Sequence, residues 1–99
     1  MIPPSLPDLS GKTILITGAS KGIGAATVAA LGAAGAHVIA HYGSDAAGAR
    51  AATAAIPESH VLHLGADLAD LDEVEALWDA ALAWRGRIDV LVNNAAVMD

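Results

Sequence analysis

The stretch that decides the fold of this chain is TGASKGIG at residues 17–24. It follows a short apolar run, ILI at residues 14–16, and it opens a long alanine-rich segment with the composition of a helix. Glycine lets a backbone turn sharply and approach a ligand closely. The first turn of a helix offers unpaired N–H groups and the positive end of the helix dipole to an anion. A strand, a glycine-rich turn and a helix start in this order therefore predict a cradle for a phosphate group.

Segments typical of strands and helices alternate along the rest of the chain. Gly35 has the place of a left-handed cap after the first helix, and Ser44-Asp45 offers a start for the second. The third helix is the most clearly amphipathic, and its apolar stripe comprises Leu71, Val74, Leu77, Trp78, Ala81 and Leu82. Strands are predicted at residues 12–17, 37–42, 59–64 and 88–93, and helices at residues 22–34, 46–56 and 70–84.

This alternation predicts a parallel sheet with right-handed crossovers between helix layers. The expected fold class is α/β, a three-layer Rossmann-type sheet with the strand order 3-2-1-4. In that order the ligand crevice lies at the carboxyl end of the first strand, where the strand order reverses. The glycine-rich stretch lies at the same end. Residues 1–10, which hold three prolines, are expected to form an amino-terminal arm, and residues 11–99 a domain of four strands and three helices.

The composition narrows the class of protein. The chain is 55% hydrophobic and 16% charged, which suits a globular core. Its net charge of −6 argues against a nucleic-acid partner, which would require a basic face. The absence of cysteine excludes disulfides and thiolate metal sites and favours a cytoplasmic location. No apolar run is long enough for a membrane span, and the amino terminus lacks the features of a signal peptide.

Four histidines raise the question of a metal site, which we do not expect. His60 and His63 are three residues apart on a predicted strand, so their side chains should face opposite sides of the sheet. No acidic or cysteine partner lies at ligand spacing.

The glycine spacing, T-G-x-x-x-G-x-G, resembles that of the short-chain dehydrogenase/reductase family and its 3-oxoacyl-reductase members. Three further segments are similar to the family: GKT at residues 11–13 before the first strand, Asp67-Leu68 after the third, and NNAA at residues 93–96, like the family's N-N-A-G. The resemblance runs from Gly11 to the end of the chain and covers the first, nucleotide-binding half of a typical member. Residues 11–99 are therefore expected to be a partial NAD(P)-binding Rossmann domain.

The resemblance implies a set of dinucleotide contacts. Gly18 permits the turn after the strand, Gly22 lets the backbone approach the pyrophosphate, and Gly24 lets the helix press on the sheet. Ser20 either donates its hydroxyl to a phosphate or caps the helix. The residues expected to contact the cofactor are Gly18, Ser20, Lys21, Gly22, Ile23, Gly24, Tyr42, Gly43, Ser44, Asp67, Leu68, Asn94, Ala95 and Ala96.

Two places bear on the choice between NADP and NAD. Lys21 lies in the glycine loop, where a basic residue of the family commonly reaches the 2′-phosphate of NADP. An NAD enzyme usually carries an acid at the end of the second strand, where this chain has Tyr42 followed by Gly43. Asp45 is the nearest acid, and its place after Ser44 favours a helix start over a bond to the ribose. The sequence therefore favours NADP, with NAD as the alternative.

Three other positions have two interpretations or depart from the family. Asp67 is expected to accept a hydrogen bond from the adenine amino group, and its alternative is a turn or N-cap aspartate. Asn94 and the residues after it would line the ribose through the main chain. Ala96 replaces the family's usual glycine, which adds a methyl group to a crowded bend.

The family's proton-transfer residues have no counterpart in these 99 residues. The family uses a Ser and a Tyr-x-x-x-Lys pair, whereas Tyr42 is the only tyrosine here and Ala46 lies four residues after it. The catalytic residues are expected beyond Asp99. The resemblance implies reversible hydride transfer between NADPH and a small carbonyl or alcohol substrate, with the isolated chain catalytically incomplete.

An alternative is a non-catalytic nucleotide-binding or self-assembling module. The apolar strand at residues 88–93 would be an open edge, so pairing with a second copy or a complementing fragment is expected there.

Overall fold

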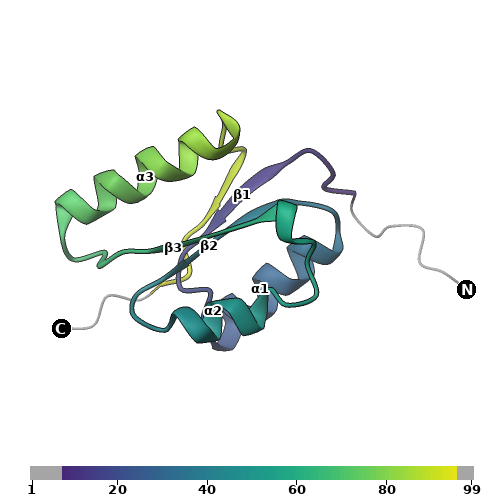
Figure 1. Cartoon of the computed structure of the whole chain (residues 1–99), viewed down its shortest axis with the longest axis horizontal. Helices are drawn as coiled ribbons and strands as arrows, with labels where there is room; N and C mark the ends of the chain where they lie inside the picture. Colours follow the sequence, from purple (N-terminus) through teal and green to yellow (C-terminus); the bar gives the residue numbers. More distant parts are fainter. Residues whose placement is uncertain (1–7, 96–99) are drawn as a thin grey trace, which may run out of the picture.

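The computed structural model describes residues 8–95, which form a four-stranded parallel sheet with helices on both faces (Figure 1). The strands are β1 (Thr13–Ile16), β2 (His37–Tyr42), β3 (Val61–Gly65) and β4 (Val90–Val92). The helices are α1 (Gly22–Ala33), α2 (Ala46–Ala52), α3 (Leu71–Arg85) and a short 3-10 helix, η1 (Glu58–His60). The sheet has the order β3-β2-β1-β4 with every pairing parallel, which confirms the predicted fold class and strand order.

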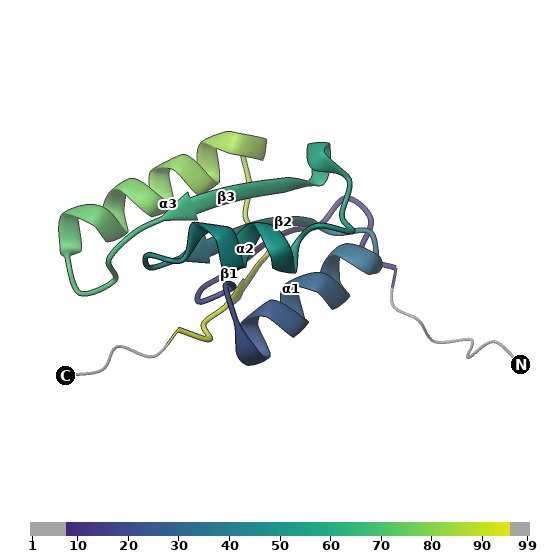
Figure 2. The same cartoon turned by 60° about the horizontal axis from the view of Figure 1, so that its bottom comes forward.

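The sheet separates two apolar cores, with α1 and α2 on one face and α3 on the other (Figure 2). All four residues of β1 are buried, as the unbroken apolar run predicts for a central parallel strand. Ile14 and Ile16 face the larger core, where Val28 of α1 meets the sheet. Leu15 faces the smaller core, which includes Ala81 of α3. The carboxyl end of β1 therefore emerges from a fully buried central strand.

Helix α2 is shorter than predicted. It ends at Ala52, whereas the sequence pattern placed its end at Ile56. The Thr53 hydroxyl donates to the carbonyls of Ala49 and Arg50, and the chain then turns. The turn buries Ile56 against α1, in the space left by the missing side chain of Gly32. Burial of Ile56 explains why the helix stops where its own propensity does not require it.

Helix α3 confirms the predicted range within one residue, but its apolar stripe is only partly covered. The Asp70 carboxylate accepts from the N–H groups of Asp72 and Glu73, and Gly86 ends the helix in a left-handed conformation. Leu77 is buried, whereas Leu71, Trp78 and Leu82 of the same stripe are 80%, 44% and 38% exposed. The sheet ends at β4, and a hollow lined by Leu77, Trp78 and Leu91 lies between this edge and the helix.

Two strands also differ from prediction in their bounds, and one apolar side chain of α1 is exposed. β3 begins at Val61 because His60 belongs to η1, and β4 spans only Val90–Val92. Ile23, an apolar residue of the first helix, is 78% exposed and packs on no core.

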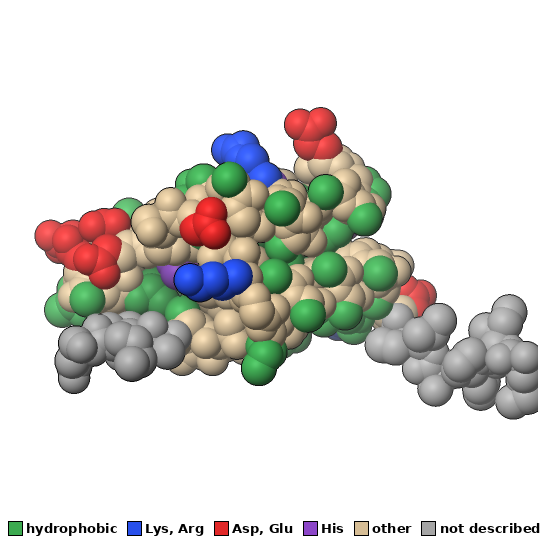
Figure 3. All heavy atoms as spheres, turned by 90° about the horizontal axis from the view of Figure 1, so that it is seen from below, with side chains coloured by type: hydrophobic (Ala, Val, Ile, Leu, Met, Phe, Trp, Pro, Cys, Tyr) green, Lys and Arg blue, Asp and Glu red, His purple; other side chains and the backbone are tan. Residues whose placement is uncertain are grey.

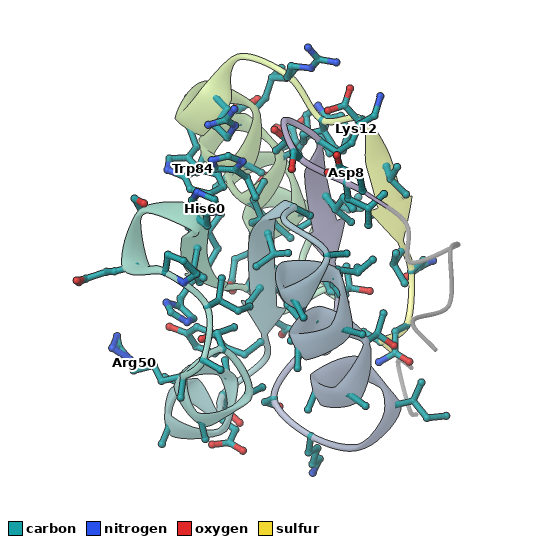
Figure 4. The ribbon with its side chains drawn as sticks, turned by 90° about the vertical axis from the view of Figure 1, so that its right-hand side faces the viewer. Asp8, Lys12, Arg50, His60 and Trp84 are labelled. Atoms are coloured by element: carbon teal, nitrogen blue, oxygen red, sulfur yellow. The ribbon has the colours of Figure 1, made fainter. Side chains whose placement is uncertain are left out.

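His60 and His63 lie on opposite sides of the sheet, as predicted, although His60 belongs to η1 and not to the strand. The His60 ring stacks on the His37 ring at 4.0 Å between centroids, and Trp84 of α3 approaches His37 edge-on at 6.1 Å. Figure 4 shows His60 and Trp84 close together on one side of the molecule. His63 faces the other side and bonds to the Thr53 hydroxyl at 2.8 Å.

The lowered pKa values of His37 and His63 predict that the protein loses stability in mild acid. Burial, followed by the positive charges of Arg85 and His60, holds the pKa of His37 below its ordinary value of 6.5. Burial, followed by Arg50, lowers the pKa of His63 in the same direction. The unfolded chain therefore binds more protons than the folded protein just below pH 6.5, and the free energy of unfolding should fall as the pH drops through this window.

Urea denaturation between about pH 5 and pH 8 measures this dependence. We expect the free energy of unfolding to be constant above pH 6.5, the ordinary pKa of histidine, and to decline below it. The decline should be shallower in the double variant His37→Gln/His63→Gln. A free energy of unfolding that stays flat down to about pH 5 would contradict the prediction.

Candidate functional site

A cleft of about 530 Å³ lies where the predicted crevice was placed, beyond the carboxyl ends of β1, β2 and β3. Its volume falls in the ordinary range for a small-molecule site. Three loops line it, from the end of β1, the end of β2 and the end of β3, and the residues after β4 close one side. The lining residues are Gly18, Ser20, Lys21, His41, Gly43, Ala66, Asp67, Leu68, Ala69, Asn94 and Ala95.

The glycine-rich loop brings the first turn of α1 to this cleft. Gly18 has a φ of 68°, in the left-handed region that favours glycine, and a Cβ there would lie 3.0 Å from the Cα of Ala95. Lys21 is the N-cap of α1, and among the described residues no side chain caps the helix. The first turn of α1 also carries no acidic residue. Its N–H groups and the positive end of its dipole are thus available to an anion.

A hydrogen-bond network joins the start of this loop to the residues after β4. The Thr17 hydroxyl oxygen accepts from the backbone N–H groups of Asn94 and Ala95, each at 3.0 Å. The same hydroxyl donates to the side-chain oxygen of Asn93 at 3.2 Å. The Asn94 side-chain amide donates to the Gly18 carbonyl at 3.1 Å. Two segments more than 70 residues apart therefore fix one another's backbone.

His41 links the other two sides of the cleft. Its side chain is 2% exposed, and its Nδ1 accepts from the Gly18 N–H at 3.0 Å. Its Nε2 lies 2.9 Å from the carbonyl oxygen of Ala66, at the end of β3. One ring therefore contacts both the glycine loop and the loop that carries Asp67.

Comparison with known proteins decides which family this arrangement represents. The family model described as short chain dehydrogenase matches residues 12–99 of this chain. The chain belongs to that family. The 3beta-hydroxysteroid dehydrogenase 1 of Eggerthella lenta is 45% identical over 92 residues, which are 91% of this chain and 35% of that protein. The 3-oxoacyl-(acyl-carrier-protein) reductase of Synechocystis is 41% identical over 91 residues, which are 90% of this chain and 37% of that protein.

Solved structures also resemble this chain in fold. A short-chain dehydrogenase/reductase from Serratia marcescens superposes with a TM-score of 0.82 at 38% identity, covering 91% of this chain and 38% of that one. The 3-ketoacyl-(acyl-carrier-protein) reductase of Brucella melitensis, complexed with NADH, has a TM-score of 0.81 at 37% identity and covers 90% and 36%. The N-domain of a bacterial malonyl-CoA reductase, with NADP, has a TM-score of 0.83 at 30% identity and covers 92% and 18%.

These comparisons confirm the resemblance predicted from the glycine spacing, including the likeness to 3-oxoacyl reductases. The family is one of oxidoreductases with an NAD(P)-binding Rossmann fold. This chain spans little more than a third of the length of the curated relatives named above.

Within this short chain dehydrogenase fold, the structure brings most of the predicted site residues together. Those that line the cleft are Gly18, Ser20, Lys21, Gly43, Asp67, Leu68, Asn94 and Ala95. Gly22 and Gly24 lie in the first turn of α1 behind the loop, and Ile23 points away into solvent. Tyr42 and Ser44 are absent from the lining of the cleft among residues 8–95, and Ala96 lies outside the described residues.

The positions with two interpretations are resolved in part. Ser20 does not cap α1, because Lys21 holds the N-cap position. Asp45 is the N-cap of α2 and accepts from the Gly48 N–H at 2.8 Å, as its place after Ser44 predicted. One Asp67 carboxylate oxygen accepts from the Ala69 N–H at 2.9 Å, which is the turn contact expected of the alternative interpretation. Tyr42 packs its ring over Gly65, on the sheet face opposite to His41.

Thr17 and His41 were not predicted as site residues. Each is a polar residue at the carboxyl end of a buried strand, adjacent to a loop, and that position was the available signal. Figure 3 shows one group of acidic side chains at its left-hand end and separate acidic side chains elsewhere on this face. The first turn of α3 carries Asp72 and Glu73.

Neither a metal-binding cluster nor a membrane-spanning helix is found among the described residues. Residues 8–95 contain no group of three or more His, Asp or Glu side chains that could hold a metal ion. In the same part of the chain, none of the helices combines the length and the apolar character that crossing a membrane requires.

Proposed function

We propose that this chain is the NADP-binding portion of a short-chain dehydrogenase/reductase that transfers hydride reversibly between NADPH and a small carbonyl or alcohol. The observation that carries the proposal is the cleft at the carboxyl edge of the sheet, into which the uncapped first turn of α1 and the Gly18 turn open. Backbone N–H groups and a helix dipole of this kind suit a pyrophosphate. Asp67, Leu68 and the main chain at Asn94 would then hold the adenine and ribose ends.

The chain's residues favour NADP over NAD. Lys21 is exposed and lines the cleft, so its ammonium group is available to a 2′-phosphate. The carboxylate of Asp45 is engaged by the Gly48 N–H, which lowers its availability to a ribose hydroxyl. The solved relatives include complexes with NADH and with NADP, so the preference of this chain rests on its own residues.

Replacing Lys21 by alanine tests the cofactor choice. We expect the affinity for NADPH to fall roughly tenfold, since one charge-assisted contact to a phosphate contributes about 1.5 kcal/mol. The affinity for NADH should change little. Isothermal titration with both nucleotides measures the difference. Lys12→Ala is the matched control, because Lys12 lies at the opposite, amino end of β1 (Figure 4). Equal losses for both nucleotides, or tighter binding of NADH by the unmodified protein, would refute the NADP preference.

The chemical step requires groups that these residues do not supply. Tyr42 is the only tyrosine of the sequence, and it packs against Gly65 away from the cleft lining. The proposed activity belongs to a protein in which a Ser and a Tyr-x-x-x-Lys pair complete the site, and the isolated chain is proposed to be inactive. A cytoplasmic location, consistent with the absence of cysteine, forms part of the same proposal.

Self-association is a second proposal, and a separate observation favours it. Val90 and Leu91 of the edge strand β4 are 44% and 53% exposed, and Leu91 lines the same hollow as the half-exposed Trp78 of α3. An apolar edge of this kind favours pairing with a second copy or a complementing fragment. Light scattering of the isolated chain should therefore give a mass above that of a monomer. A folded monomer at high concentration would refute this second proposal.

A further inference from the structure

Both ring nitrogens of His41 form hydrogen bonds to backbone groups that line the cleft. Its ring is buried at the end of β2, with Nδ1 facing the Gly18 N–H and Nε2 facing the Ala66 carbonyl. The backbone reinforces both links. The Ala19 N–H donates to the His41 carbonyl at 2.8 Å, and the Ala66 N–H donates to the Tyr42 carbonyl at 3.1 Å. The ring therefore spans the distance between the glycine loop and the loop after β3.

The two contacts define a single protonation state of the ring. A backbone N–H can only donate, so Nδ1 must carry a free lone pair toward Gly18. A carbonyl can only accept, so Nε2 must carry the hydrogen toward Ala66. The neutral ring with its hydrogen on Nε2 satisfies both contacts. A second proton on Nδ1 would place two N–H donors against one another at 3.0 Å.

We propose that His41 is a positioning residue, which holds the glycine loop and the Ala66–Asp67 loop at the spacing a dinucleotide requires and does so only while the ring is neutral. The inference rests on the proposed function, since it names how the same cleft is kept in shape. Protonation of His41 breaks the bond to Gly18, and the loop that carries the first turn of α1 then loses its tie to β2.

The charged groups around the ring come from three elements. Lys21 reaches the cleft from the glycine loop and Asp67 from the end of β3. Glu73 of α3 accepts from the Asp67 N–H at 2.9 Å. All three side chains are exposed, so water screens their effect on the buried ring. On the two neighbouring strands, β1 ends in Ile16 and β3 places Leu64 beside His41, and both are apolar.

A bound dinucleotide has an effect on binding in acid that opposes the loss of the bond between His41 and Gly18. Its phosphates would attract a protonated ring and strengthen binding in acid. The donor–donor contact with Gly18 acts in the opposite direction, because a buried donor left without an acceptor is more costly than a screened charge pair is favourable. We therefore expect acid to weaken binding.

Nucleotide binding at two pH values tests the proposal. NADPH and NADH are titrated into the full chain at about pH 5.5 and about pH 7.5. Both affinities should be several-fold weaker at the lower pH. His41→Leu, which lacks both contacts, should bind roughly fivefold more weakly than the unmodified protein even at the higher pH.

His41→Asn is the decisive variant. An asparagine side-chain oxygen can replace Nδ1 as the acceptor for Gly18, and it does not titrate. This variant should keep most of the affinity at the higher pH and lose the pH dependence. The matched control is His63→Asn, since His63 lies on the next strand, bonds to Thr53 and is not part of the cleft lining given above. The control should retain the pH dependence of the unmodified protein.

Hydrogen exchange of the Gly18 amide, followed by NMR without nucleotide, separates this inference from the proposed function. Intrinsic amide exchange slows as the pH falls, so the quantity compared is the protection factor of the Gly18 amide. We expect this protection factor to drop at the lower pH in the unmodified protein and not in His41→Asn. If that holds while neither nucleotide binds, the positioning role stands and the proposed function fails. If nucleotides bind with the same pH dependence in His41→Asn as in the unmodified protein, or bind more tightly in acid only when His41 is present, the inference is overturned.

Discussion

Gly24→Ala is expected to abolish measurable dinucleotide binding and to destabilise the fold. Gly24 is buried in the first turn of α1, and a Cβ there would overlap the Gly18 carbonyl oxygen and lie 2.5 Å from the Asn94 side-chain nitrogen. The new methyl group must displace the glycine loop or the Asn94 amide, and either movement breaks the bond between Asn94 and Gly18. Overpacking together with that lost bond should lower the free energy of unfolding by about 2–4 kcal/mol.

Calorimetric titration with NADPH and urea denaturation measure the two effects of Gly24→Ala. Gly43→Ala is the matched control, because Gly43 also lines the cleft and no described atom lies within 4 Å of the position its Cβ would take. The control should retain stability and most of its affinity. If both variants lose binding equally, the loss cannot be assigned to contact between α1 and the glycine loop, and the prediction fails.

Thr17→Val is expected to cause the largest loss of stability from a change that keeps the shape of the side chain. The Thr17 hydroxyl is the acceptor for the N–H groups of Asn94 and Ala95, and Thr17 is only 6% exposed. Valine fills the same volume but leaves both donors without a partner. Each unsatisfied buried donor costs roughly 1–3 kcal/mol, so the free energy of unfolding should fall by about 2–4 kcal/mol once partial relaxation is included.

Urea denaturation compares Thr17→Val with Thr17→Ser and Thr27→Val. Serine keeps the hydroxyl and should recover most of the lost stability. Thr27 lies on α1 and donates only to the Ile23 carbonyl, an exposed contact within the helix, so its change to valine should cost less than about 0.5 kcal/mol. A Thr17→Val protein as stable as Thr27→Val would show that the residues after β4 do not depend on this hydroxyl.

The strand order and the place of the cleft could be predicted because they follow from periodicity and chain order. The continuous apolar run of β1 marks a central strand, and the helices between the strands require parallel crossovers. The end of α2 could not be predicted in this way. It is set by the Thr53 hydroxyl and by burial of Ile56 against α1, and both depend on contacts formed only in the folded chain.

The candidate site also combines residues that could be predicted from the sequence with residues that could not. The loop residues Gly18, Ser20 and Lys21 line the cleft as their spacing predicted. Tyr42 does not, because alternation along β2 directs its side chain to the opposite face from His41. His41 itself was overlooked as a contact, since its partners at Gly18 and Ala66 are 23 and 25 residues away and no local pattern reveals them.

The bonds from Thr17 and Gly18 to Asn94 and Ala95 also bear on the order of events during synthesis. The glycine loop leaves the ribosome early, but its partners follow 76 to 78 residues later. These partners do not exist until the intervening segment has been synthesised, and contacts between residues so far apart in sequence are slow to form. The loop therefore acquires its final geometry only after β4 has joined the sheet, and a nascent chain that ends short of Asn94 carries the phosphate motif without a finished site.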